Sequence, residues 1–386
     1  MNVRSMLEKE EQIRLSPYAA KSAESRGREH PISEDLTRTD FQRDRDRVIH
    51  SKAFRRLQFK TQVFLSPEGD HYRTRLTHTL EVAQVARTIA RGLKLNEDLT
   101  EAIALAHDLG HTPFGHIGER TLNRLNAEGF RHYEQSLRVV ERLEREGGLN
   151  LTWETRDGIR NHSGGHSANT LEGQVVARSD RIAYINHDID DALRAGIITP
   201  EDLPKAALKV LGQTHGERIN TMITDILRES QGRPAINMSG PVQAATDSMR
   251  EFLFEWVYQD SWRHDEERKC DFILTKLFEH FQAHYLEMPE ESVQSAHEEG
   301  VQRAVTLSKT IFDIDPVSDR YGAKIIVDQD IVCGWNDLGR IVQLNSSFVS
   351  APQVIIGNVT GRPGYYHLTG GSARLQADNV VLGFLG

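Results

Sequence analysis

Apolar residues recur at helical spacing in two neighbouring segments, and this periodicity restricts the chain to a body built from packed helices. The first segment runs from about residue 75 to residue 91 and stops at Gly92, a residue type that often ends helices. Its apolar face consists of Val82, Val85, Ala86 and Ile89. The second segment starts at Asn96, a favourable N-cap, and reaches Gly110. Each helix is therefore predicted to bury one face.

The rest of the first three quarters of the chain favours the same fold class. Residues 1 to about 40 are predicted to form an irregular polar arm. Helical patterns then follow at about 39–64, 116–127, 132–146, 171–195 and 244–289. Hydrophobic residues make up 38% of the 386, which suffices for a sizeable core. We expect a mainly α body over residues 1–300.

The composition changes after residue 299. Residues 300–386 contain no glutamate, and runs such as 324–328 and 353–357 are rich in Val and Ile between Gly and Asn turns. A short β-rich C-terminal segment, residues 301–386, is therefore predicted, and its role is unassigned. Three origins remain open for it: an added β-module, a swapped terminus, or a frame disruption.

The charge distribution favours a small anionic ligand. A net charge of −9 argues against general nucleic-acid binding, yet basic residues are concentrated between Arg43 and Lys60. Such a zone in an acidic protein suits a small polyphosphate, and Arg55 within it is assigned to the substrate. A solvated helix face and, more weakly, a single-stranded DNA site are the alternatives.

The apolar content of the chain and its few cysteines indicate a cellular compartment. The chain has no run approaching the ~20 apolar residues of a membrane span, and its first residues lack the apolar core of a signal peptide. Two cysteines give neither a disulfide framework nor a zinc cluster. We expect a cytoplasmic protein without a membrane partner.

Histidines and carboxylates extend the apolar faces of the predicted helices in a pattern typical of a metal site. His78 lies on the first face, His107 and Asp108 end the second helix, and Asp180 lies among apolar residues further on. One such histidine alone would suggest core packing, but a buried carboxylate is costly unless paired or metal-bound. The four side chains suit Mn, Fe, Zn, Ni or Co, and Mg remains open. The metal-binding core is placed at about 70–195.

Three stretches resemble the bacterial dGTPase-like HD triphosphohydrolases. They are Arg75-Leu-Thr-His78, His107-Asp-Leu-Gly-His-Thr-Pro-Phe-Gly-His116-Ile-Gly-Glu119, and Glu172-Gly-Gln-Val-Val-Ala-Arg-Ser-Asp180. The resemblance covers roughly residues 1–300 and implies the HD-domain helical phosphohydrolase fold. It implies metal-dependent hydrolysis of deoxynucleoside triphosphates to a deoxynucleoside and inorganic triphosphate, with Mg²⁺ accompanying the triphosphate.

The resemblance also implies roles for single residues. The four metal ligands are those named above. His116 corresponds to the catalytic histidine near the α-phosphate, Glu119 to the carboxylate that orients it, and His132 to a further active-site histidine. The positions expected to bind substrate are Arg75 at a phosphate, Gln62 and Asp188 at the 3′-hydroxyl, and Tyr184 under the sugar. His111, four residues after His107, is predicted to contact a phosphate or to support the metal ligands.

Two other functions remain open at this point. One is another HD-type nucleotide phosphohydrolase, such as a 5′-nucleotidase or a phosphodiesterase. The other is a regulatory protein that binds deoxynucleoside triphosphates with low turnover. The resemblance further implies a homo-oligomer in which deoxynucleoside triphosphates act as substrates and also as allosteric activators.

Overall fold

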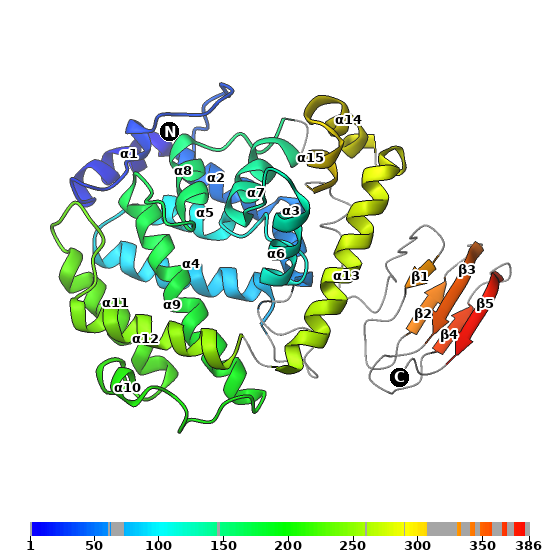
Figure 1. Cartoon of the computed structure of the whole chain (residues 1–386). Coiled ribbons are helices and arrows are strands. Elements are labelled where there is room, and N and C mark those ends of the chain that lie inside the picture. The colour runs from blue at the N-terminus through cyan, green and yellow to red at the C-terminus, as the bar shows by residue number, and fades with distance from the viewer. Residues whose placement is uncertain are drawn as a thin grey trace. The chain divides into compact units, whose positions relative to one another are not determined.

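The computed structural model describes residues 2–60, 62, 73–144, 147–258, 261–288, 290–306 and five strands beyond them (Figure 1). The chain divides into two compact units, each formed by separate stretches of sequence. The first unit comprises Met1–Gln58, Gly69–His111 and Arg131–Glu266. The second comprises Phe59–Glu68, Thr112–Phe130 and Glu267–Gly386. The predicted division at residue 300 stays a prediction.

In its described residues, the first unit is built from helices joined by loops. Its helices are α1 (Val3–Arg14), α2 (Asp40–Ile49), α3 (Lys52–Arg56), α4 (Arg75–Gly92), α5 (Glu97–Ala106), α7 (His132–Arg138), α8 (Trp153–Asn161), α9 (Leu171–Arg194), α10 (Lys205–Leu211), α11 (His215–Ser230) and α12 (Gly240–Trp256). Short helical turns are η1 (Ser22–Glu24) and the π-helical η3 (Val139–Leu143), while η2 (Leu57–Phe59) lies at the boundary.

Helix α5 forms the centre of the first unit, because it packs against α2, α4, α8 and α9. Its residues Leu99, Ala102, Ile103 and Ala106 are fully buried. Figure 1 shows α4 and α9 running past each other, and these two helices are in contact. Apolar faces at helical spacing therefore bring α4, α5 and α9 together, and these are the helices on which the metal ligands are predicted.

The predicted helices around these positions are confirmed, with one difference. The side chain of Asn96 accepts the backbone N–H of Leu99, as expected for an N-cap, and Thr74 caps α4 in the same way. Helix α5 ends at Ala106 rather than at Gly110. Gly110 instead allows the chain after α5 to pass close to α7. A Cβ at this position would lie 2.1 Å from the backbone nitrogen of Ser136, so only glycine fits here.

The prediction of an irregular polar arm over residues 1–40 is wrong for residues 3–14, which form α1. This helix is polar on nearly all sides, so it lacks the apolar stripe that predicts a helix. It is held instead by the buried carboxylate of Glu11, which accepts hydrogen bonds from Ser22 and Asn96. Tertiary contacts thus order a segment that sequence periodicity does not reveal.

The second unit contains α6 (Gly115–Leu125), most of α13 (Ser261–Ala283), η4 (Tyr285–Glu287), α14 (Glu290–Glu299) and α15 (Val301–Thr306). Its core joins Phe114, Ile117 and Leu122 to residues of α13 such as Leu274 and Phe278. Thr121 donates a hydrogen bond to Asp271 at 2.7 Å. Residues 112–130 are therefore fixed on α13, far along the chain.

Five strands are described near the C-terminus: β1 (Asp330–Val332), β2 (Arg340–Gln343), β3 (Phe348–Ile356), β4 (Tyr365–Leu368) and β5 (Arg374–Leu382). Strands β1, β3 and β5 pair in parallel, as do β2 and β4. Residues 301–306, the start of the segment predicted to be β-like, are helical. The mainly α body is thus the established part of the fold, and the β-rich segment stays a prediction. Among the described helices, none has both the length and the apolar character required to cross a membrane.

Candidate metal centre

The structure brings together the four side chains that were predicted to hold a metal. His78 projects from α4, His107 is the C-cap residue of α5 and is followed by Asp108, and Asp180 projects from α9. His78 Nε2 lies 3.0 Å from Asp180 Oδ1, and His107 Nε2 lies 3.7 Å from that oxygen and from Asp108 Oδ1. Side chains from three helices thus converge on one buried point.

The orientation of His107 shows that this point fits a cation. Its Nδ1 donates to the carbonyl of Ala104 at 2.7 Å, so the lone pair of the neutral imidazole is on Nε2. That Nε2 atom is buried and has no hydrogen-bond partner among the residues described. A lone pair that faces two carboxylate oxygens without a proton donor is repulsive unless a positive ion lies between them. Two imidazoles with two carboxylates suit a divalent transition metal.

The two carboxylates are held in their ionised form. Burial raises the pKa of Asp108, but the electrostatic interactions of its carboxylate with His107 and Arg75 outweigh this effect and hold that pKa well below its usual range. Burial acts on the pKa of Asp180 in the same way and is outweighed by the hydrogen bond from His78, so this pKa is also lowered. Charged carboxylates are the form that binds metal.

Arg75, predicted to contact a phosphate, instead donates a hydrogen bond to Asp108, one of the candidate metal ligands. Its Nη1 donates to Asp108 Oδ2 at 2.6 Å, and both side chains are buried. This charge-assisted bond fixes the carboxylate and places a guanidinium beside the candidate centre. A role of Arg75 at a phosphate stays a prediction.

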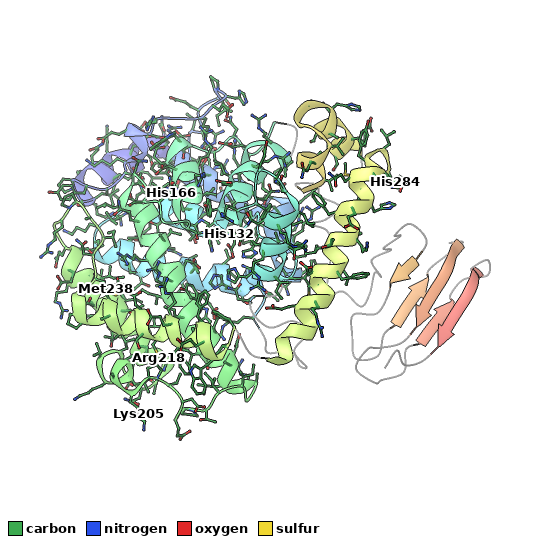
Figure 2. All side chains as sticks on the ribbon, in the orientation of Figure 1. His132, His166, Lys205, Arg218, Met238 and His284 are labelled. Carbon is green, nitrogen blue, oxygen red and sulfur yellow. The ribbon has the colours of Figure 1, made fainter. Side chains whose placement is uncertain are left out.

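His162 was not predicted from the sequence, yet it joins His132 and Asp108 in a second group of close ligand atoms. It is the C-cap residue of α8, and its Nε2 lies 3.3 Å from Nε2 of His132. Burial, together with the charges of His107 and His132, lowers the pKa of His162 to about 3. Figure 2 labels His132 among the helices of the first unit. The signal that could have revealed His162 is a histidine at the end of a helix, as at His107.

Two further histidines of the first unit, His111 and His187, lie beside members of these groups. His111 stacks on His132 with ring centroids 4.9 Å apart. His187, also unpredicted, is buried on α9, with its ring 6.0 Å from that of His78 and its Nδ1 3.1 Å from Glu81. His111 therefore lies beside a predicted active-site histidine, while its contact with a phosphate stays a prediction.

The residues predicted to bind the sugar follow Asp180 along α9. Tyr184 is partly exposed, and burial followed by the charge of Asp180 raises its pKa to about 12, so the phenol stays protonated. Asp188 is buried and accepts a hydrogen bond from the hydroxyl of Tyr258, which sequence analysis did not single out. One stripe of α9 thus presents a carboxylate, a phenol and a carboxylate in order.

Arg55, predicted to bind substrate, is exposed on α3.

Gln62, His116 and Glu119 belong to the second unit. His116 Nδ1 lies 3.9 Å from Glu119 Oε2, which is within ion-pair range but longer than a hydrogen bond. The His116 side chain is 72% exposed. The preceding Phe114 has φ 61°, an uncommon left-handed conformation for a bulky residue, and its buried ring holds it there. Gln62 is partly buried.

Comparisons with known proteins agree with this description. Residues 75–185 match the HD domain, a range that contains all four candidate ligands, and residues 236–311 match the phosphohydrolase-associated domain. A deoxyguanosinetriphosphate triphosphohydrolase-like protein of Caldanaerobacter subterraneus is 61% identical over 306 residues, which cover 79% of this chain and 90% of that protein.

Two further relatives carry the same name. The protein of Desulfatibacillum aliphaticivorans is 51% identical over 295 residues, covering 73% of this chain and 84% of the relative. The protein of Clostridium perfringens strain SM101 is 50% identical over 316 residues, covering 79% and 92%. The similarity therefore extends over most of each relative.

Proposed function

Because this chain belongs to the deoxyguanosinetriphosphate triphosphohydrolase-like family of HD-domain phosphohydrolases, we propose that it hydrolyses deoxynucleoside triphosphates in a metal-dependent reaction. The observation that carries the proposal is the lone pair of His107 Nε2, which faces Asp108 and Asp180 across 3.7 Å. A divalent cation held by His78, His107, Asp108 and Asp180 would supply a Lewis acid for a phosphate oxygen.

The proposed reaction breaks the bond between the α-phosphorus and the 5′-oxygen. Water supplies the hydroxyl group that remains on the triphosphate, and the 5′-oxygen takes up a proton. The products are a deoxynucleoside and inorganic triphosphate. We assign the proton delivered to the 5′-oxygen to His116, with Glu119 orienting the imidazole. The exposure of His116 and the carboxylate at 3.9 Å support this assignment.

Other residues of the chain would bind and orient the substrate. Arg75 is fixed by Asp108, so its charge is preorganised for a phosphate without a large entropy cost. Asp188, held by Tyr258, is suited to accept a hydrogen bond from a sugar hydroxyl. Tyr184 would lie under the sugar, and Gln62 would bind the 3′-hydroxyl. Arg55 and His111 would contact the phosphates, and His132 would act as a further catalytic histidine. Homo-oligomers and activation by deoxynucleoside triphosphates are part of the same proposal.

The test is product identification over a panel of the four deoxynucleoside triphosphates with Mn²⁺ or Mg²⁺. Anion-exchange chromatography should show deoxynucleoside and triphosphate in equal amounts, and His107→Ala should show neither. Release of pyrophosphate or orthophosphate would exclude the proposed products and favour another HD-type phosphohydrolase. Tight nucleotide binding without turnover, even in a mixture of all four nucleotides, would favour a regulatory protein.

A further inference from the structure

Residues 15–26, which follow α1 and contain η1, form a strap that is bound to the first turns of three helices. Glu154, in the first turn of α8, accepts hydrogen bonds from the end of the strap. Glu172, in the first turn of α9, accepts the backbone N–H of Ala20 at 3.0 Å. The start of α5 is tied in as well, because its N-cap Asn96 donates its backbone N–H to Glu172 at 2.9 Å. The strap therefore connects the starts of α5, α8 and α9 within the first unit.

The two carboxylates that bind the strap differ in how their oxygens are used. Glu154 uses both, since the hydroxyl of Ser25 donates to one at 2.7 Å and the backbone N–H of Arg26 donates to the other at 2.7 Å. In Glu172 a single oxygen, Oε1, accepts both N–H groups. Its Oε2 is buried without a hydrogen-bond partner among the residues described. A neutral carboxylic acid tolerates this arrangement better than a carboxylate, because the charge on Oε2 would lack hydrogen bonds.

Asn96 also binds a second buried carboxylate, that of Glu11 on α1. The side-chain N–H of Asn96 donates to Glu11 Oε1 at 3.1 Å, while its backbone N–H donates to Glu172. Ser22 of the strap donates its N–H and its hydroxyl to Glu11 at 2.7 and 2.8 Å. All four residues are buried. Ionisation of both carboxylates would therefore place two negative charges on one asparagine, away from water.

We propose that the strap is a pH-sensitive latch: ionisation of Glu172 releases it from the starts of α5 and α9, while Ser25 and Arg26 stay on α8. The closed strap requires protonated Glu172. When the strap moves away, the ionised carboxylate gains contact with water and is no longer held beside Glu11. Glu154 already satisfies both of its oxygens, so the end of the strap remains attached and acts as the hinge. The latch does not depend on the proposed function, because no step of the hydrolysis involves it.

The charged groups around Glu172 favour this release. Burial, with a smaller contribution from Glu11, raises the pKa of Glu172 to about 7. Burial and, to a smaller extent, Asp98 of α5 also raise the pKa of Glu11 against its hydrogen bonds. Glu154 of α8 is bound to the strap, and Lys21 forms its ion pair within the strap. The listed ion pairs of the described residues thus give Glu172 no cation that would hold it charged in the closed strap.

The balance between the closed and the open strap then depends on pH in a defined way. Glu172 titrates at about 7 in the closed strap and at its ordinary value of 4.5 in the open one. Because the closed form has the higher pKa, its stabilisation is complete below pH 4.5 and is lost as the pH rises through 7. Between pH 6 and pH 8 the ratio of open to closed strap should increase about tenfold, and above pH 8 it should stay constant.

The experiment measures hydrogen exchange of the whole chain by mass spectrometry at pH 6, 7, 8 and 9, with rates corrected for the intrinsic effect of pH. Protection of the strap amides in the wild type should fall about tenfold from pH 6 to pH 8 and then level off. Glu172→Gln keeps an acceptor oxygen and does not titrate, so its protection should be constant. Glu24→Gln removes an exposed carboxylate of the strap and should behave as the wild type. The strap amides should also exchange faster than those of α11, because release of the strap leaves α11 folded.

Equal protection of the wild-type strap at pH 6 and pH 8, or an equal loss of protection in Glu172→Gln, would overturn the inference. So would equal protection of the strap and of α11, because exchange would then occur through unfolding of the whole unit. If Glu172→Gln does not fold, the wild-type profile decides. Protection that levels off above pH 8 supports the latch, and a further fall between pH 8 and pH 9 assigns the effect to another group.

Discussion

Glu172 should make the protein less stable as the pH rises through neutrality. Its side chain is fully buried at the start of α9, where one carboxylate oxygen accepts the backbone N–H groups of Asn96 at 2.9 Å and Ala20 at 3.0 Å. Burial, with a smaller contribution from the neighbouring carboxylate of Glu11, raises the pKa of Glu172 to about 7 against these hydrogen bonds. Folding thus favours the protonated form of this group.

The magnitude follows from the difference between the folded and unfolded chain. A folded pKa of about 7 against an ordinary value of 4.5 is a difference of about 2.5 pH units, or about 3 kcal/mol at 1.36 kcal/mol per unit. Because the folded pKa is the higher one, the stabilisation is complete below pH 4.5 and is lost as the pH rises through 7. Glu172→Gln keeps an acceptor oxygen for both N–H groups and does not titrate.

The assay is urea denaturation of the wild type, Glu172→Gln and Glu201→Gln at pH 4.5, 6, 7 and 8.5. The free energy of unfolding of Glu172→Gln, relative to the wild type, should increase by about 3 kcal/mol from the lowest to the highest pH. Glu201 is exposed, so its variant should show a constant difference. A constant difference for Glu172→Gln as well would refute the reasoning.

Three further substitutions should change stability or substrate binding because each removes or blocks a contact seen in the structure. Asp44→Ala removes the buried carboxylate that pairs with Arg28 and accepts hydrogen bonds from Thr152 and Thr155, and leaves Arg28 only its longer ion pair with Asp40. It should lower the free energy of unfolding by about 3–5 kcal/mol in urea titrations, with Asp44→Asn costing less. Gly110→Ala places a methyl group against the backbone of α7 and should cost about 1–3 kcal/mol and lower the Mn²⁺ content measured by dialysis. Tyr258→Phe releases Asp188 and should raise KM for deoxynucleoside triphosphates more than it lowers kcat, as steady-state kinetics would show; an unchanged KM would contradict this role.

Sequence periodicity predicts the part of the site that lies on apolar helix faces. His78 follows the stripe of α4, His107 and Asp108 follow that of α5, and Asp180 lies among buried residues of α9. For His78, His107 and Asp108 the local pattern determines burial, and a buried carboxylate needs a partner. Asp180 is partly buried. Family resemblance added His116, Glu119 and the sugar-binding positions, whose local sequence alone does not distinguish them from polar surface residues.

Sequence analysis missed the residues whose roles depend on contacts with distant parts of the chain. Tyr258 follows α12 in a sequence without a motif, and its importance comes only from Asp188, seventy positions earlier. Helix α1 lacks an apolar stripe and depends on Glu11. Both cases share one cause: the stabilising partner is distant along the chain, so no window of sequence contains both members of the pair.

His162 is an intermediate case, because its orientation is local although its partners are not. The last carbonyls of a helix have no intrahelical partner, and a histidine at the C-cap can satisfy one of them with Nδ1–H. His107 does this for Ala104 and His162 does it for Ile159. This hydrogen bond stabilises the end of each helix, and because it uses the Nδ1 hydrogen it leaves the lone pair of the neutral imidazole on Nε2. A histidine that directly follows a helix therefore has its Nε2 oriented for a ligand before any partner residue approaches. The close contact of Gly110 with α7 then helps to bring both groups of ligating side chains, one with His107 and one with His162, to the carboxylate of Asp108.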